Sequence, residues 1–182
     1  MASAAIARSL KLDPITGEED LRDLTHPRHA LSQFYRAFNT RDIVMMQDNW
    51  SDAEDISMDT PLGGIKRGWP EIRRVYEGIF SSHAQVRVEF HDYTIHAAGD
   101  SFFAVGRERG RYESQALAFD LQIRTTRIFR FDGEHWRQVH HHGSIDDSVL
   151  LQRYQSAVAL QSSLRSPLLQ PLRMKSPLFP ML

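Results

Sequence analysis

Three consecutive histidines, His140, His141 and His142, are the side chains of this 182-residue chain most suited to chemistry. They end the stretch TTRIFRFDGEHWRQVHHH, whose alternation of apolar and polar residues is typical of strands. On a strand His140 and His142 share one face, and His141 points to the other. An imidazole can ligate a metal or transfer a proton near neutral pH. The histidines therefore raise three hypotheses: a metal site, an acid–base group, or side chains hydrogen-bonded in the sheet or at a subunit contact.

We expect no metal and no other cofactor at these histidines. A zinc site requires three or four converging ligands. The chain contains no cysteine, and the sequence offers His140 and His142 no convincing third ligand.

An arginine in the same segment stands where a core residue is expected. Every second residue across 117–131 is apolar or threonine except Arg127. The same alternation in the preceding strand aligns Arg107 with Phe103. A buried guanidinium keeps its charge and requires a carboxylate, an anionic ligand or water. Two interpretations follow: Arg127 pairs with an internal carboxylate such as Asp59 or reaches the rim, or both arginines line a pocket for an acidic ligand.

The elements that position these residues change in type along the chain. Apolar residues recur at helical spacing in the first half and alternate as in strands in the second half. Helices followed by antiparallel strands indicate an α+β domain. We predict helices within residues 25–42, from residue 42 to 50, and over 69–83 and 146–164, and strands over 54–59, 85–90, 101–112, 117–131 and 135–143.

The length of the chain suits one domain with appendages. We expect an N-terminal arm at residues 1–24, a domain at 25–145, and a C-terminal helix and tail at 146–182. The tail, RSPLLQPLRMKSPLFPML, holds four of the eight prolines and cannot form a regular helix.

Composition excludes several classes of function. Hydrophobic residues make up 41% and charged residues 25% of the chain, and the formal net charge is -1. This balance gives no electrostatic reason to expect nucleic acid or a membrane surface as a partner. No apolar run approaches the roughly 20 residues of a membrane span. We therefore expect no nucleic-acid or membrane partner, and a cytoplasmic location by default.

Two stretches carry a family resemblance: DNWSDAEDISMDTPLGGIKRGWPEIRRVYEGIF and TRIFRFDGEHWRQVHHHGS. Together they resemble the nuclear transport factor 2-like superfamily, which includes ketosteroid isomerase and the SnoaL-like polyketide cyclases. The likeness is greatest to the association (hub) domain of calcium/calmodulin-dependent protein kinase II and its small bacterial relatives, and it covers roughly residues 28–145. It implies a cone-shaped α+β fold, in which three N-terminal helices pack on a curved, mostly antiparallel sheet around a pocket.

The resemblance also implies positions for pocket residues. Hub domains direct two arginines into the pocket at positions that match Arg127 and Arg107, and in this register His141 faces the pocket. A third pocket arginine of the hub domains is replaced here by Gly143. Trp50 ends a helix that overlooks the pocket in this fold.

Ketosteroid isomerase activity is not expected, because its catalytic base falls at Thr60, its oxyanion tyrosine at Phe34 and its protonated aspartate at Arg127. Whether the protein is an enzyme stays open. Asp59, His141 and Tyr76 are the candidate catalytic acid–base residues.

The leading hypothesis is a pocket protein that binds a small acidic or polar organic molecule through Arg107, Arg127, His141 and Trp50. The alternatives are an enzyme of the lyase, cyclase or isomerase type and an oligomerisation module without a ligand. Because this fold exposes the convex face of its sheet, we also expect a homo-oligomer, most simply a dimer. The apolar residues considered for that face are Val88, Phe90, Ile128 and Trp136.

Overall fold

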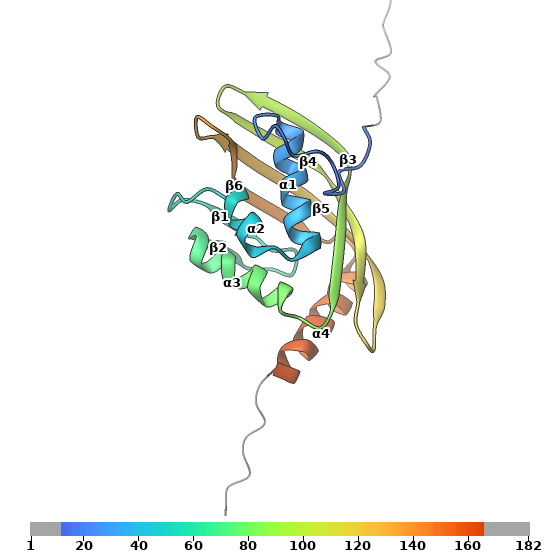
Figure 1. The fold of residues 1–182 in the computed structure, drawn as a ribbon. Helices are drawn as coiled ribbons and strands as arrows, with labels where there is room; N and C mark the ends of the chain where they lie inside the picture. Colours follow the sequence, from blue (N-terminus) through green and yellow to red (C-terminus); the bar gives the residue numbers. More distant parts are fainter. Residues whose placement is uncertain (1–11, 166–182) are drawn as a thin grey trace, which may run out of the picture.

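The structure, a computed structural model, describes residues 12–165 (Figure 1). The first eleven residues of the expected arm and the proline-rich tail at 166–182 lie outside the described residues. Within the described range, no helix is long and apolar enough to cross a membrane.

Within residues 12–165, four helices form where the apolar periodicity predicts them. They are α1 (Pro27–Thr40), α2 (Ile43–Asn49), α3 (Gly68–Phe80) and α4 (Ser148–Arg165). The side chain of His26 caps α1 by accepting a hydrogen bond from the backbone N–H of Arg28. Asp42 caps α2 in the same way, because its carboxylate accepts from two backbone N–H groups of the first turn.

Six strands form one curved, mostly antiparallel sheet, so the predicted α+β class and cone-shaped fold are confirmed. The order across the sheet is β2-β1-β6-β5-β4-β3, and the pair β1 and β6 is parallel. The strands are β1 (Ser57–Asp59), β2 (Ile65–Arg67), β3 (Gln85–Ala98), β4 (Ser101–Glu113), β5 (Ala118–Phe131) and β6 (Trp136–Ser144).

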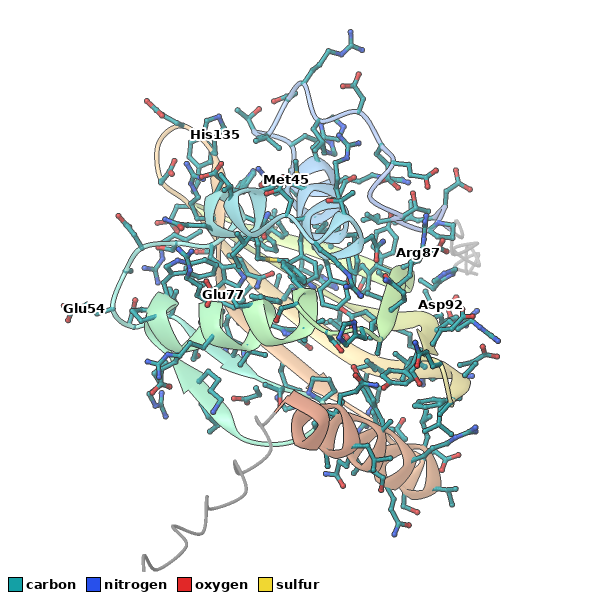
Figure 2. All side chains as sticks on the ribbon, turned by 60° about the horizontal axis from the view of Figure 1, so that its bottom comes forward. Met45, Glu54, Glu77, Arg87, Asp92 and His135 are labelled. Carbon is teal, nitrogen blue, oxygen red and sulfur yellow. The ribbon has the colours of Figure 1, made fainter. Side chains whose placement is uncertain are left out.

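The helices α1, α2 and α3 cover the concave face of the sheet, and α4 lies at the end near the β4–β5 turn (Figure 1). Tyr154 and Ala157 of α4 are buried. The segment before α1 also contributes to the core, because Ile15 is fully buried and pairs with Phe90 of β3. Charged side chains such as Glu54 and Arg87 project from the surface (Figure 2).

Two β-bulges decide which side chains face inward. One extra residue in β3 between His91 and Thr94 shifts its register against β4. The other lies in β6, where Ile128 pairs with His140 but Phe129 pairs with Gln138. Because of this second bulge, Gln138 and His141 both point to the concave face although three positions separate them.

Candidate functional site

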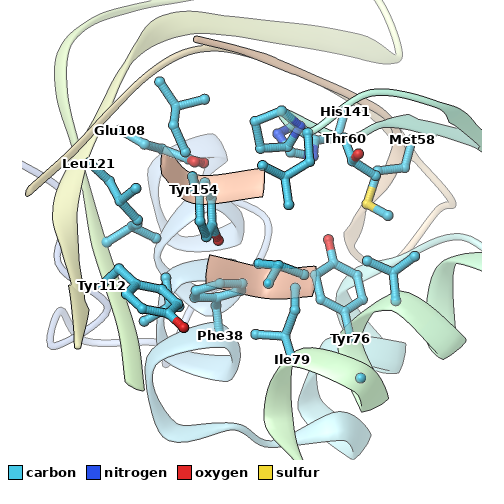
Figure 3. A pocket seen from close by; sticks show the side chains of 18 of the residues that line it. Phe38, Met58, Thr60, Tyr76, Ile79, Glu108, Tyr112, Leu121, His141 and Tyr154 are labelled. Carbon is cyan, nitrogen blue, oxygen red and sulfur yellow. The ribbon is translucent and has the colours of Figure 1, made fainter. Parts of the chain in front are cut away.

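A cavity of about 380 Å³ lies between α1, α3, α4 and the concave face of the sheet (Figure 3). Most of its wall is apolar, with Phe38, Met58, Ile79 and Leu121 among the lining residues. Lys66, Arg74 and Gln161 also line it and are partly or fully exposed. These three residues mark the part of the wall that reaches solvent, and the buried polar groups lie at the opposite, inner end.

Arg127 lies at the inner end of the cavity and makes three side-chain hydrogen bonds. Its side chain is 1% exposed. It donates hydrogen bonds to a Glu108 oxygen at 2.7 Å, to the Gln138 side-chain oxygen at 2.8 Å and to the Tyr35 hydroxyl at 3.3 Å. Its guanidinium carbon lies 3.4 Å from the centre of the Phe34 ring. Sequence parity correctly predicts the burial of Arg127. The side chain pairs with an internal carboxylate and also lines the cavity, so each interpretation describes part of its environment.

The ion pair neutralises the inner end of the cavity. Burial opposes the charge on Arg127, but contacts with Tyr35 and Glu108 raise its pKa above the ordinary value. Tyr35 also donates a hydrogen bond of 3.0 Å to the same Glu108 oxygen. Burial raises the pKa of Tyr35 well above its usual range, so the phenol stays protonated. The guanidinium charge is therefore already compensated within the protein.

His141 faces the cavity, as the register with Arg127 predicts. It is 5% exposed, and neither ring nitrogen has a hydrogen-bond partner among the described residues. Burial, reinforced by the nearby charge of Arg127, lowers the pKa of His141 well below its usual range. The imidazole is therefore neutral at physiological pH, with one nitrogen able to donate and the other able to accept.

Tyr76 lines the same cavity from α3, and its buried hydroxyl lies near Trp50 and Arg127 but makes no well-formed hydrogen bond in the described part of the chain. Burial raises the pKa of Tyr76 to about 12, so this hydroxyl is a donor at neutral pH. Tyr112 and Tyr154 add two further phenols to the cavity wall (Figure 3). Burial raises the pKa of Tyr154 as well. Buried polar groups normally have partners, so unpartnered groups facing a cavity indicate a place for a ligand or water.

Arg107 does not reach this cavity, so the prediction that it lines the pocket beside Arg127 is wrong. Its side chain is about half exposed on the convex face, 3.9 Å from Asp146. Phe103 and Val105 share that face and are 42% and 43% exposed. The concave face of β4 carries Glu108 instead.

Asp59 and Trp50 also lie outside the cavity wall. Asp59 is on the opposite face of β1 from the cavity-lining Met58, where its carboxylate lies 3.1 Å from His142. Its expected pairing with Arg127 is therefore wrong. Trp50 is buried at the end of α2 and belongs to the hydrophobic core.

Glu108 is the buried cavity residue that sequence analysis misses. The signal was present in GRERGRY, because arginines at alternate positions indicate a solvated strand face. Arg107, Arg109 and Arg111 are indeed exposed. By period two, Glu108 must then point inward.

The comparisons with known proteins agree with this fold. The family model of the SnoaL-like domain matches residues 28–148. A "putative dehydratase" of the nuclear transport factor 2-like family from Streptomyces avermitilis is 20% identical, with a TM-score of 0.60 over 65% of this chain and 92% of that chain. A "putative" calcium/calmodulin-dependent protein kinase type II association domain from Thiobacillus denitrificans is also 20% identical, with a TM-score of 0.58 over 69% and 98%.

A nuclear transport factor 2-like protein from Rhodospirillum rubrum, of unknown function in nutrient uptake, is 23% identical, with a TM-score of 0.53 over 64% of this chain and 94% of that chain. Identities this low establish the shared fold and no shared activity. The curated proteins contain no match to the chain. The family model matches most of the chain, so the chain belongs to the SnoaL-like domain family, and its fold is similar to that of solved nuclear transport factor 2-like proteins.

Proposed function

We propose that the protein binds a small, largely apolar organic molecule whose carbonyl or hydroxyl oxygen meets His141 at the inner end of the cavity. The observation that carries this proposal is the His141 imidazole, which is buried in the cavity wall without a hydrogen-bond partner among the described residues. A ligand oxygen there would satisfy a nitrogen that is otherwise costly to bury. Tyr76 offers a second donor in the same cavity.

The charge distribution favours a neutral ligand over an acidic one at this inner end. Arg127 is the guanidinium at the inner end, and Glu108 compensates it at 2.7 Å. A carboxylate placed beside them would face the like charge of Glu108. Of the acidic and polar ligands expected from the sequence, this environment favours a largely apolar molecule that carries an uncharged oxygen.

An acid–base enzyme is the second candidate, because the unpartnered imidazole of His141 and the phenol of Tyr76 line the same cavity. A neutral imidazole can accept a proton, and the Tyr76 phenol can donate a hydrogen bond to a carbonyl. Asp59 has no part in this candidate because it lies on the other face of the sheet. Deuterium exchange at the α-carbon of 2-tetralone, faster with the protein than in buffer and lost in His141→Leu, would support the enzyme.

We also propose that the protein is a dimer formed through the convex face of the sheet. Phe103 and Val105 of β4 are large, exposed apolar residues there, and Ile128 of β5 pairs with Phe103 and is half-buried. Contiguous exposed apolar side chains of this kind mark interaction surfaces.

The binding proposal is tested with three probes that share one ring system: naphthalene, 2-naphthol and 2-naphthoate. By titration calorimetry, 2-naphthol should bind more tightly than naphthalene, which lacks the oxygen, and than 2-naphthoate, which adds a charge. His141→Leu should lower the 2-naphthol affinity roughly threefold to tenfold, the value of about one net hydrogen bond, and leave naphthalene unaffected.

The matched control is His135→Leu, which removes a histidine from the β5–β6 loop away from the cavity. It should bind all three probes as the parent does. Tighter binding of 2-naphthoate than of 2-naphthol would overturn the neutral-ligand proposal in favour of an acidic ligand. Failure of every probe to bind would favour an oligomerisation module.

A further inference from the structure

A second cluster of polar side chains lies on the convex face of the sheet, opposite the cavity. His140 and His142 stand two positions apart on β6 and point to that face. The strand β1 pairs with β6 in parallel, so that Asp59 is in register with His142 and Ser57 with His140. The topology thus brings a carboxylate and two imidazoles together from positions about eighty residues apart in sequence.

The contacts within this cluster are short. The Asp59 carboxylate lies 3.1 Å from Nδ1 of His142, and the Ser57 hydroxyl lies 2.8 Å from Nδ1 of His140. One ligand atom from each of Asp59, His140 and His142 lies within 4.8 Å of the others. The sequence expectation that the two histidines lack a converging third ligand is therefore wrong. The missing ligand comes from a strand whose parallel pairing the sequence does not reveal.

We propose that Asp59, His140 and His142 bind one divalent first-row transition-metal ion, most simply Zn²⁺. Two imidazoles and one carboxylate are borderline ligands that suit zinc and ferrous iron rather than magnesium or calcium. Three protein ligands leave at least one coordination position for water or a small ligand. This three-residue group is called the outer triad below.

The distances allow closure around an ion without movement of the strands. Ligand atoms bound about 2.1 Å from one zinc ion in a tetrahedron lie about 3.4 Å apart. The Asp59 and His142 atoms, at 3.1 Å, are already near that separation. His142 is exposed and His140 is partly exposed, so rotation of their side chains can bring in the remaining ligand.

Ser57 orients the imidazole of His140 in the outer triad. A hydrogen bond between its hydroxyl and Nδ1 fixes the ring and leaves Nε2 to the metal. Metal-bound histidines generally have such an outer partner on the other nitrogen. Ser57 is therefore a positioning residue, and its loss should weaken the site without removing a ligand.

The outer triad is independent of the proposed ligand cavity. Met58 and His141 line the cavity, whereas their neighbours Ser57, Asp59, His140 and His142 alternate to the other face. The proposal therefore stands or fails separately from the binding of 2-naphthol.

The test uses the full-length chain after treatment with a chelator and dialysis. Titration with Zn²⁺ against a chromophoric chelator should give one bound ion per chain at micromolar concentration. Co²⁺ should bind in competition with Zn²⁺ and produce a visible absorption band from nitrogen and oxygen ligands. Asp59→Asn and His142→Leu should each lower the zinc affinity by more than Ser57→Ala, whose loss should be in the range of about 10- to 100-fold.

The matched control is His83→Leu, which removes an exposed histidine of the turn after α3. It should retain the parent affinity, while circular dichroism confirms that each variant is folded. The proposal is overturned if the parent binds no tighter than Asp59→Asn, if His83→Leu loses as much affinity as His142→Leu, or if the stoichiometry differs from one ion per chain. Any of these results would leave Asp59 and His142 as a hydrogen-bonded surface pair.

Discussion

At the level of single residues, the buried wall of the cavity contains a paired guanidinium, Arg127, and two polar side chains without a well-formed hydrogen bond, His141 and Tyr76. Arg127 has three hydrogen-bond partners, whereas His141 and Tyr76 make no well-formed hydrogen bond with the described residues. A charged, paired group holds the structure together, because either partner left alone would be a buried charge. A neutral, unpaired group gains from a ligand. The difference supports a structural role for Arg127 and the binding role that we propose for His141.

Arg127→Met should destabilise the fold by about 3–5 kcal/mol, because Glu108 would remain buried without its cation. The double variant Arg127→Met/Glu108→Gln should recover part of the stability that Arg127→Met loses. Urea unfolding measures the free energy of unfolding of each variant. Arg107→Met is the exposed control, and it should lower this free energy by under about 1 kcal/mol. Equal losses at Arg107 and Arg127 would refute the structural role of the buried pair.

Sequence parity predicts the burial of Arg127 but not its partner, and the reason lies in β4. The concave face of β4 carries Gly106 and Gly110, where β3 approaches closely. A Cβ at Gly110 would lie 2.0 Å from the Arg87 carbonyl oxygen. These glycines weaken the apolar signal of the inward face, while Phe103 and Val105 strengthen that of the outward face. The stronger pattern therefore marks the wrong side of the strand.

At the scale of elements, local signals predict the helices and long strands, but long-range pairing escapes them. Local patterns locate α1 to α4 and β4 to β6, but they predict only the first part of β3, which continues past residue 90 to Ala98. The short strand β2 lies outside the strands that the sequence predicts. The parallel pairing of β1 with β6 joins segments about eighty residues apart, and no local pattern encodes it. The bulge in β6 likewise has no clear sequence signal, yet it turns both Gln138 and His141 inward.

The segment before α1 is attached through Glu19, and this contact predicts a pH dependence of stability. Burial alone raises the pKa of Glu19, but hydrogen bonds from Ser32 and the backbone N–H groups of Thr16 and Gly17 outweigh it and lower the pKa. A depressed folded pKa contributes stability that is present above the unfolded value of about 4.5 and is lost as the pH falls through the folded value.

Glu19→Gln should therefore lower the urea midpoint at pH 7, and the gap between parent and variant should shrink at pH 3. Glu18→Gln is the matched control, because Glu18 is exposed and forms a surface ion pair with Arg87. It should change the midpoint little at either pH. A gap for Glu19→Gln that stays constant, or widens, between pH 7 and pH 3 would contradict this role.

At the scale of the whole molecule, the sheet separates two surfaces with different properties. The concave face encloses the cavity, and the convex face carries the apolar patch of Phe103, Val105 and Ile128 together with the outer triad. The family resemblance predicts the cone and its pocket. It does not predict which residues line the cavity or the convex face, because the fold leaves these side chains free to vary.

The proposed dimer gives a prediction at this scale. Light scattering at micromolar concentration should report twice the chain mass of 21.0 kDa. Phe103→Glu should dissociate the dimer, because it places a charge in the apolar patch. Val149→Glu makes the same change at an exposed position of α4 and should leave the mass unchanged. A monomeric parent, or equal effects of both variants, would contradict a dimer through the convex face.

Nitrogen NMR of the His141 imidazole reports directly whether a ligand oxygen contacts this residue. Long-range proton–nitrogen spectra of ¹⁵N-labelled protein should show a neutral His141 ring in the free state. Saturation with 2-naphthol should shift one ring nitrogen of His141 by several parts per million, whereas naphthalene bound to the same cavity should not. If 2-naphthol binds and leaves both nitrogens of His141 unshifted, or if naphthalene produces the same shift, His141 does not receive the ligand oxygen.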